Sequence, residues 1–135
     1  MERMSTNFKD FISGYSIEVV PNSAAKIESF KEILPTNTRV YIAHLETESI
    51  ATMVATAKRI NEEGFTVMPH IPARIIKNQT MLSDWISMYQ NEAGVDEALL
   101  LAGGSTKPVG DYDSSIQLIE SGLFDKAGFK RLHIA

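Results

Sequence analysis

The sequence predicts an α/β fold built on a parallel sheet, because short apolar runs alternate along the chain with longer segments of helical period. Most of the apolar runs are continuous, which is typical of strands that are covered on both faces. Their spacing along the chain fits right-handed strand–helix–strand units. We therefore expect a single domain over residues 1–135 with the order β-α-β-α-β-α-β-α-β.

Apolar runs bounded by polar, glycine or proline residues mark the predicted strands. In chain order they are Ser16–Pro21, Arg39–Leu45, Phe65–Pro72, Glu97–Gly104 and Lys130–Ala135.

The segments between these runs carry apolar residues at helical spacing. They are Ser23–Leu34, Ser49–Gly64, Thr80–Ala93 and Ser114–Ala127. Pro35 is expected to end the first of them and Gly64 the second. Asn78 or Thr80 is available as the N-terminal cap of the third.

Two architectures accept this order: an open doubly wound parallel sheet and part of a (βα)8 barrel. Periodicity alone favours the open sheet, because five strands complete one but are too few to close a barrel. In both folds, ligands collect at the carboxyl ends of the strands. Glu18, His44, His70 and the Gly103–Gly104 pair are therefore expected to converge on one rim.

Composition excludes several classes of site and partner. The chain has no cysteine, which rules out disulfides, thiolate nucleophiles and cysteine-based metal sites. Its three histidines lie on different predicted strands, so we expect no metal site. A net charge of -4 without a basic stripe disfavours nucleic acid. No apolar run is long enough for a membrane span or a signal peptide, so we expect no membrane association and a cytoplasmic location.

Four stretches of the chain resemble one enzyme family: SIEVVPNSAAKI, RVYIAHL, PHIPARIIKN and the run from LLLAGGSTKPVGDYD to KRLHIA. Together they resemble the amino-terminal portion of methylenetetrahydrofolate reductases, over about Tyr15 to Ala135. The resemblance implies a (βα)8 barrel carrying FAD, in which NADH or NADPH reduces the flavin and the flavin reduces 5,10-methylenetetrahydrofolate. It moves the expected fold to a (βα)4β half-barrel.

The resemblance also implies roles for individual residues. Glu18 would be the general acid that opens the folate's imidazolidine ring, and an apolar setting would favour its protonated form. His70, the backbone of Ala102, Gly103 and Gly104, and the ring of Tyr112 would line the flavin. The family's pattern at the glycine turn is Arg-Gly-Asp, so this chain lacks the aspartate that tunes the flavin and faces the folate. His44 has no counterpart in the family, and we expect it to be a packing residue.

The matched region is about half of the family's barrel, which leads to three further expectations. Flavin binding and activity should be weak or absent in this chain alone. The alternative function is a non-catalytic half-barrel that serves in binding or assembly. We also expect a homodimer or higher oligomer, formed through the edges of the sheet (Ser16–Pro21 and Lys130–Ala135) and driven by an apolar inner face.

Overall fold

A five-stranded, all-parallel sheet forms the centre of the protein in the computed structural model, which describes residues 8–135. Each strand lies inside a range predicted from the sequence. The strands are β1 (Ser16–Val19), β2 (Arg39–Ile42), β3 (Thr66–Pro72), β4 (Glu97–Leu101) and β5 (Arg131–Ile134). The parallel α/β class is thus confirmed.

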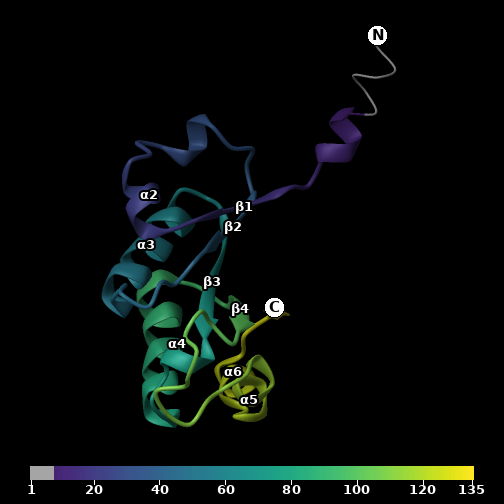
Figure 1. Ribbon diagram of the computed structural model, residues 1–135. Coiled ribbons are helices and arrows are strands. Elements are labelled where there is room, and N and C mark those ends of the chain that lie inside the picture. The colour runs from purple at the N-terminus through teal and green to yellow at the C-terminus, as the bar shows by residue number, and fades with distance from the viewer. Residues whose placement is uncertain (1–7) are drawn as a thin grey trace.

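The strands are ordered β1-β2-β3-β4-β5, so each strand pairs with the next one in the chain. A doubly wound sheet reverses this direction at its switch point, and the described strands contain no such reversal. The doubly wound alternative is therefore wrong. Because right-handed crossovers in one direction place every connection on the same face, the helices α3 (Ile50–Glu62) and α4 (Gln79–Ala93) lie together on one side of the sheet (Figure 1).

The two long helices begin and end close to the predicted positions. Ser49 caps α3, its Oγ accepting a hydrogen bond from the backbone N–H of Thr52 at 3.2 Å. Asn78 rather than Thr80 caps α4, and Gly94 ends it in the left-handed conformation with φ 68°. The apolar faces of both helices are buried against the sheet, as their periodicity predicts; the buried residues include Met53, Val54, Ala57, Ile60, Leu82, Trp85, Ile86 and Tyr89.

The segment predicted as one helix over Ser23–Leu34 is instead a short α2 (Pro21–Ala25) and a 3₁₀ turn η1 (Phe30–Glu32). The break is held by Arg59 of α3, which donates to the carbonyl oxygens of three residues, Ala24, Ile27 and Glu28. A helix through this segment would have used these carbonyls internally. The long-range contacts of Arg59 thus replace the local helical bonds.

The segment predicted as a helix over Ser114–Ala127 is also divided, into α5 (Ser115–Glu120) and α6 (Leu123–Ala127). Gly122 separates them with a φ of 72°, a conformation that stops an α-helix and favours glycine. A further 3₁₀ turn, η2 (Ala73–Ile75), directly follows β3.

Burial alternates along β2 and β4, whose helix-facing residues are covered by the helices, whereas most residues of the central strand β3 are buried on both faces. On β2 and β4, Val40, Ile42, Ala98 and Leu100 face the helices and are fully buried. The opposite face, which we term the open face, carries Glu18, Arg39, Tyr41, Met68, His70, Glu97, Leu99, Arg131 and His133. Among the described residues, no second layer covers it. The expectation of an apolar inner face is wrong, because the residues that alternate with the core positions are mostly polar or charged.

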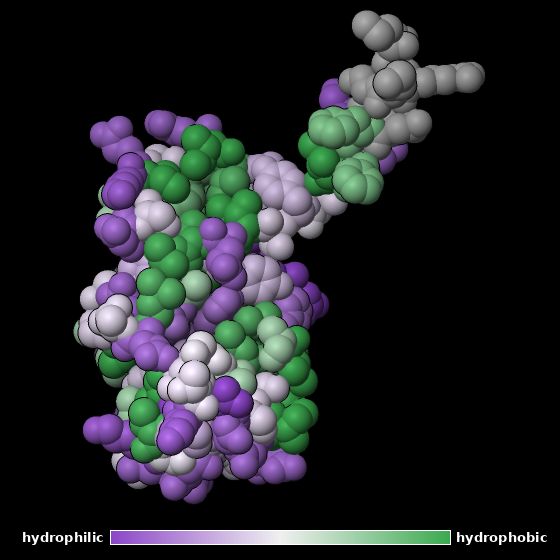
Figure 2. All heavy atoms as spheres, in the orientation of Figure 1, coloured by the Kyte–Doolittle hydropathy of each residue, from purple (hydrophilic) through white to green (hydrophobic). Residues whose placement is uncertain are grey.

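The first described residues lead away from the sheet. Residues 8–12 form a helical turn that projects from the body of the molecule (Figure 1). Phe8, Phe11 and Ile12 on this turn are exposed. The projecting segment shows green, hydrophobic surface apart from the body in Figure 2. Within residues 8–135, no helix has both the length and the apolar character needed to cross a bilayer.

Candidate functional site

Glu18 and His70 meet on the open face near the carboxyl ends of their strands. Glu18 lies on β1 and His70 on β3, with Tyr41 of the intervening strand between them. The Nε2 atom of His70 lies 2.9 Å from Oε1 of Glu18. The imidazole is 13% exposed and the carboxylate 57% exposed, so one partner is sheltered and the other reaches solvent. The sequence therefore predicted correctly that these two residues converge.

Burial sets the charge of this pair. Desolvation lowers the pKa of His70, and the attraction of the Glu18 carboxylate raises it by less. His70 is thus mostly neutral at neutral pH, and its contact with Glu18 is a hydrogen bond rather than an ion pair.

The surroundings of Glu18 differ from the expectation. Ile17 and Val19, its apolar neighbours in sequence, alternate with it along β1 and lie on the helix-covered side. The immediate partner of the carboxyl group is the imidazole of His70, and more than half of the Glu18 side chain is exposed. The apolar setting expected for Glu18 is therefore wrong.

A second polar pair lies next to the first. The hydroxyl oxygen of Tyr41 is 2.8 Å from Nδ1 of His133 on β5. The Tyr41 ring also meets the His70 ring edge-on, with 6.4 Å between the ring centres. Neither Tyr41 nor His133 was predicted from the sequence. One sequence pattern could have found them. Tyr41 and His133 each stand two positions after an arginine in RVYI and RLHI, and residues two apart in a strand share a face, so both belong to the polar face of their strands.

The glycine turn after β4 lies against the end of β3. The backbone N–H of Arg74 donates to the carbonyl oxygen of Ala102 at 2.9 Å. Gly103 has a φ of +102°, and a Cβ there would stand 3.0 Å from Cβ of Pro72. Gly104 differs, because a Cβ at this position would meet nothing within 4 Å. Gly103 is thus required by the turn itself, whereas Gly104 leaves a space that a ligand could approach.

Arg74 holds the loop that follows this turn. Its Nε donates to Oδ1 of Asp113 at 2.8 Å, and its Nη1 donates to the carbonyl oxygen of Ser105 at 3.0 Å. Gly110 also fits tightly, because a Cβ there would lie 2.0 Å from the carbonyl oxygen of Lys77. The loop is therefore fixed to the segment after β3. No role for Arg74 was predicted from the sequence.

Tyr112 and His44 have other packing partners than the Glu18–His70 pair. Tyr112 is 8% exposed and packs with the main hydrophobic core, so its ring is not presented to the open face. His44 stacks on Trp85 with 5.0 Å between ring centres, and its Nε2 lies 3.1 Å from the carbonyl oxygen of Glu48. The packing role expected for His44 is confirmed.

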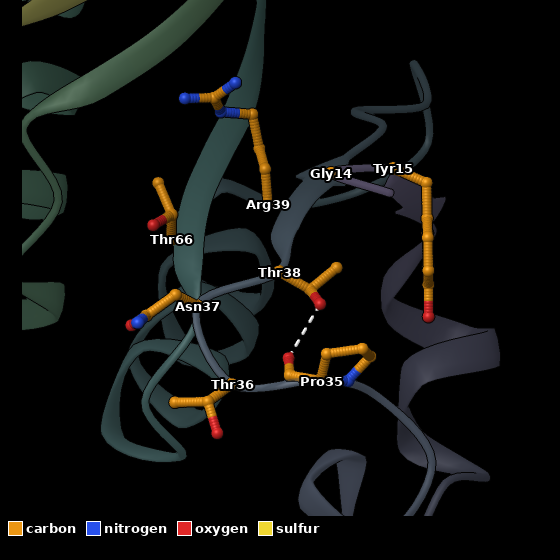
Figure 3. Close-up of a pocket in the computed structure, with 8 residues that line it drawn as sticks. All are labelled: Gly14, Tyr15, Pro35, Thr36, Asn37, Thr38, Arg39 and Thr66. Atoms are coloured by element: carbon orange, nitrogen blue, oxygen red, sulfur yellow. Dashed lines mark hydrogen bonds between the residues drawn. The ribbon is translucent and has the colours of Figure 1, made fainter. Parts of the chain in front are cut away.

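A hollow of about 260 Å³ lies at the opposite end of the sheet, between the loop before β1 and the loop before β2 (Figure 3). It is lined by Gly14, Tyr15, Pro35, Thr36, Asn37, Thr38, Arg39 and Thr66. The Thr38 hydroxyl donates to the carbonyl oxygen of Pro35 at 2.7 Å, and the guanidinium group of Arg39 points away from this loop. Because ligands of parallel α/β folds collect at the carboxyl ends of strands, we give this hollow no role in the candidate site.

No family model matches this sequence. The resemblance to methylenetetrahydrofolate reductases therefore rests on the stretches quoted above. In the part of the chain that the structure describes, no three His, Asp or Glu side chains group in a way that could hold a metal ion.

Proposed function

We propose that this chain is the amino-terminal part of a flavin-dependent reductase barrel that acts on 5,10-methylenetetrahydrofolate. The observation that carries the proposal is the Glu18–His70 pair, which lies near the carboxyl ends of β1 and β3, while the glycine turn follows β4, the neighbour of β3 in the sheet. The sequential strand order and the helices on one face support a partial (βα)8 barrel, since consecutive strands pair in the same way around such a barrel.

The space beside the glycine turn, at the carboxyl ends of the strands, fits a flat flavin ring. The open space beside Gly104 would let a planar ring approach the backbone, and the Gly103 turn presents that backbone without side-chain bulk. Gly104, Ala102 and His70 are therefore the residues that would hold the ring. Tyr112 packs with the hydrophobic core, and its contact with the flavin stays a prediction that only the resemblance supports.

Bound FAD would carry hydride from NADH or NADPH to the folate. Glu18 would take up a proton from solvent and pass it to the folate nitrogen as the carbon–nitrogen bond opens. The hydrogen bond from His70 occupies Oε1 of Glu18 and leaves Oε2 for the substrate. Because the carboxyl group is more than half exposed, solvent could return the proton after each turnover.

The alternative is a non-catalytic half-barrel that serves in binding or assembly. The exposed Phe8, Phe11 and Ile12 on the projecting turn favour it, since grouped exposed apolar side chains often mark contact surfaces. Flavin binding separates the two functions, because an assembly module needs no flavin.

The test is a titration of the purified chain with FAD, followed by flavin fluorescence. We expect weak, saturable binding that a Gly104→Val substitution weakens by about tenfold or more, because the new side chain fills the space beside the turn. Thr106→Val, at an exposed position in the same loop, is the matched control and should bind as the parent does. Saturable binding that Gly104→Val leaves as tight as in the parent chain would refute the flavin site at this turn.

A further inference from the structure

Three charged side chains group on the open face at the other end of the strands from the Glu18–His70 pair. Arg39, Glu97 and Arg131 are the first residues of β2, β4 and β5. Nη2 of Arg39 lies 4.0 Å from Oε1 of Glu97, and Nε of Arg131 lies 3.7 Å from the same oxygen. One carboxylate oxygen therefore stands between two guanidinium groups, and we term these three residues the arginine cluster.

The contacts inside the arginine cluster leave hydrogen-bonding capacity unused. Both separations exceed the 2.7–3.2 Å of a normal N–H···O hydrogen bond. The Nε atom of Arg39 is buried and has no hydrogen-bond partner among the described residues. A buried donor without an acceptor costs free energy, so an acceptor that reached Arg39 would stabilise the protein.

The charges of the cluster also do not cancel. Two guanidinium groups share one carboxylate, which leaves an excess of one positive charge on a face that no described element covers. The nearest acidic neighbour in sequence, Asp96, is held by Lys130 at 3.0 Å. The Arg131 side chain is 53% exposed, so an anion from solvent can reach the cluster.

From these observations we infer that Arg39 and Arg131 form a binding site for an oxyanion, a carboxylate or phosphate group. The planar fork of a guanidinium group matches such anions with two parallel hydrogen bonds. Glu97 lies between the two arginines and competes with the ligand for them. The site is separate from the proposed flavin site, and the inference does not depend on the reductase proposal.

Inorganic phosphate is the probe, added at constant ionic strength against chloride, with thermal unfolding and backbone NMR shifts as readouts. We expect phosphate to raise the Tm of the parent chain and to shift the amide signals of β2 and β5. Arg131→Gln should weaken phosphate binding by about tenfold, the scale of one charge-assisted hydrogen bond. Glu97→Gln should strengthen phosphate binding, because it removes the competing carboxylate.

Lys130→Gln is the matched control, since it removes one positive charge at the neighbouring residue but outside the cluster. It should bind phosphate as the parent chain does. Equal losses in Arg131→Gln and Lys130→Gln would show a response to net charge and overturn the inference. Absence of any phosphate effect in both the parent and Glu97→Gln, the variant expected to bind tighter, would also overturn it.

The oxyanion could come from a small molecule or from a carboxylate of a second copy of this chain. Light scattering across a concentration series separates these sources. A monomer that binds phosphate indicates a small-molecule ligand. Self-association that both phosphate and Arg131→Gln weaken indicates a carboxylate of the second copy.

Discussion

Replacing Arg59 should unfold the connection between β1 and β2 more than any other single polar substitution in that region. Arg59 lies on α3 and donates to the carbonyl oxygens of Ala24, at 2.8 Å, of Ile27, and of Glu28, at 3.3 Å. Its guanidinium group also lies 5.3 Å from the ring centre of Phe30 and 3.6 Å from the Glu63 carboxylate. These contacts hold the segment in which the predicted helix is broken.

The magnitude follows from the number and exposure of these contacts. A hydrogen bond from a charged donor contributes about 1.5–3 kcal/mol. The Arg59 side chain is 35% exposed, so water replaces part of each bond, and the ion pair with Glu63 adds little. We therefore expect Arg59→Met to lower the free energy of unfolding by about 3 kcal/mol, equivalent to a fall in Tm of about 10 °C for a domain of this size.

Chemical denaturation with circular dichroism measures this loss directly. Arg59→Lys should recover only part of the stability, because an ammonium group cannot reach several carbonyls with the geometry of a guanidinium. Lys58→Gln, at the preceding and exposed position of the same helix, is the control and should change stability by less than about 0.5 kcal/mol. Equal stabilities for Arg59→Met and Lys58→Gln would refute the structural role of Arg59.

Three further substitutions or conditions have clear expected outcomes. Tyr89→Phe should leave stability unchanged or raise it by about 1 kcal/mol in thermal unfolding, because the buried Tyr89 hydroxyl has no partner among the described residues; a large loss would show that it has one. Burial lowers the pKa of His44 and His70, so the unfolded chain binds more protons than the folded chain below about pH 6.5. The free energy of unfolding should therefore be highest above about pH 6.5 and fall as the pH drops below it. Denaturant titrations that give the same free energy of unfolding at every pH would contradict this. Gly110→Ala should lower the free energy of unfolding by at least about 1–3 kcal/mol, because the new Cβ would overlap the carbonyl oxygen of Lys77. A folded variant of equal stability would disprove that overlap.

Periodicity predicted the two long helices because the sequence patterns that specify them are local. The capped ends of α3 and the apolar face of α4 follow from residues within a few positions of one another. The expected helix over Ser23–Leu34 failed because its structure depends on Arg59, which is distant in sequence. Local propensity cannot report such a contact.

The candidate site was predictable only where simple rules of strand geometry place its residues. The positions of Glu18 and His70 follow from the rule that carboxyl ends of parallel strands meet at one rim. The roles of Tyr41 and His133 depend on which face of each strand the helices cover, and continuous apolar runs hid that alternation. The burial of Tyr112 was not predictable, because a loop residue can turn into the core, which no strand or helix period reveals.

The central claim is the acid role of Glu18 in a flavin-dependent reduction of folate. In a full-length relative of this chain, anaerobic mixing of the flavin-loaded enzyme with NADH, and then with 5,10-methylenetetrahydrofolate, measures flavin reduction and reoxidation as separate steps. Glu18→Gln should leave reduction by NADH unchanged and slow reoxidation by the folate by about 10²-fold or more, whereas Glu28→Gln, on the loop between α2 and η1, should alter neither step. Reoxidation at equal rates in the parent full-length enzyme and in its Glu18→Gln variant would contradict the account.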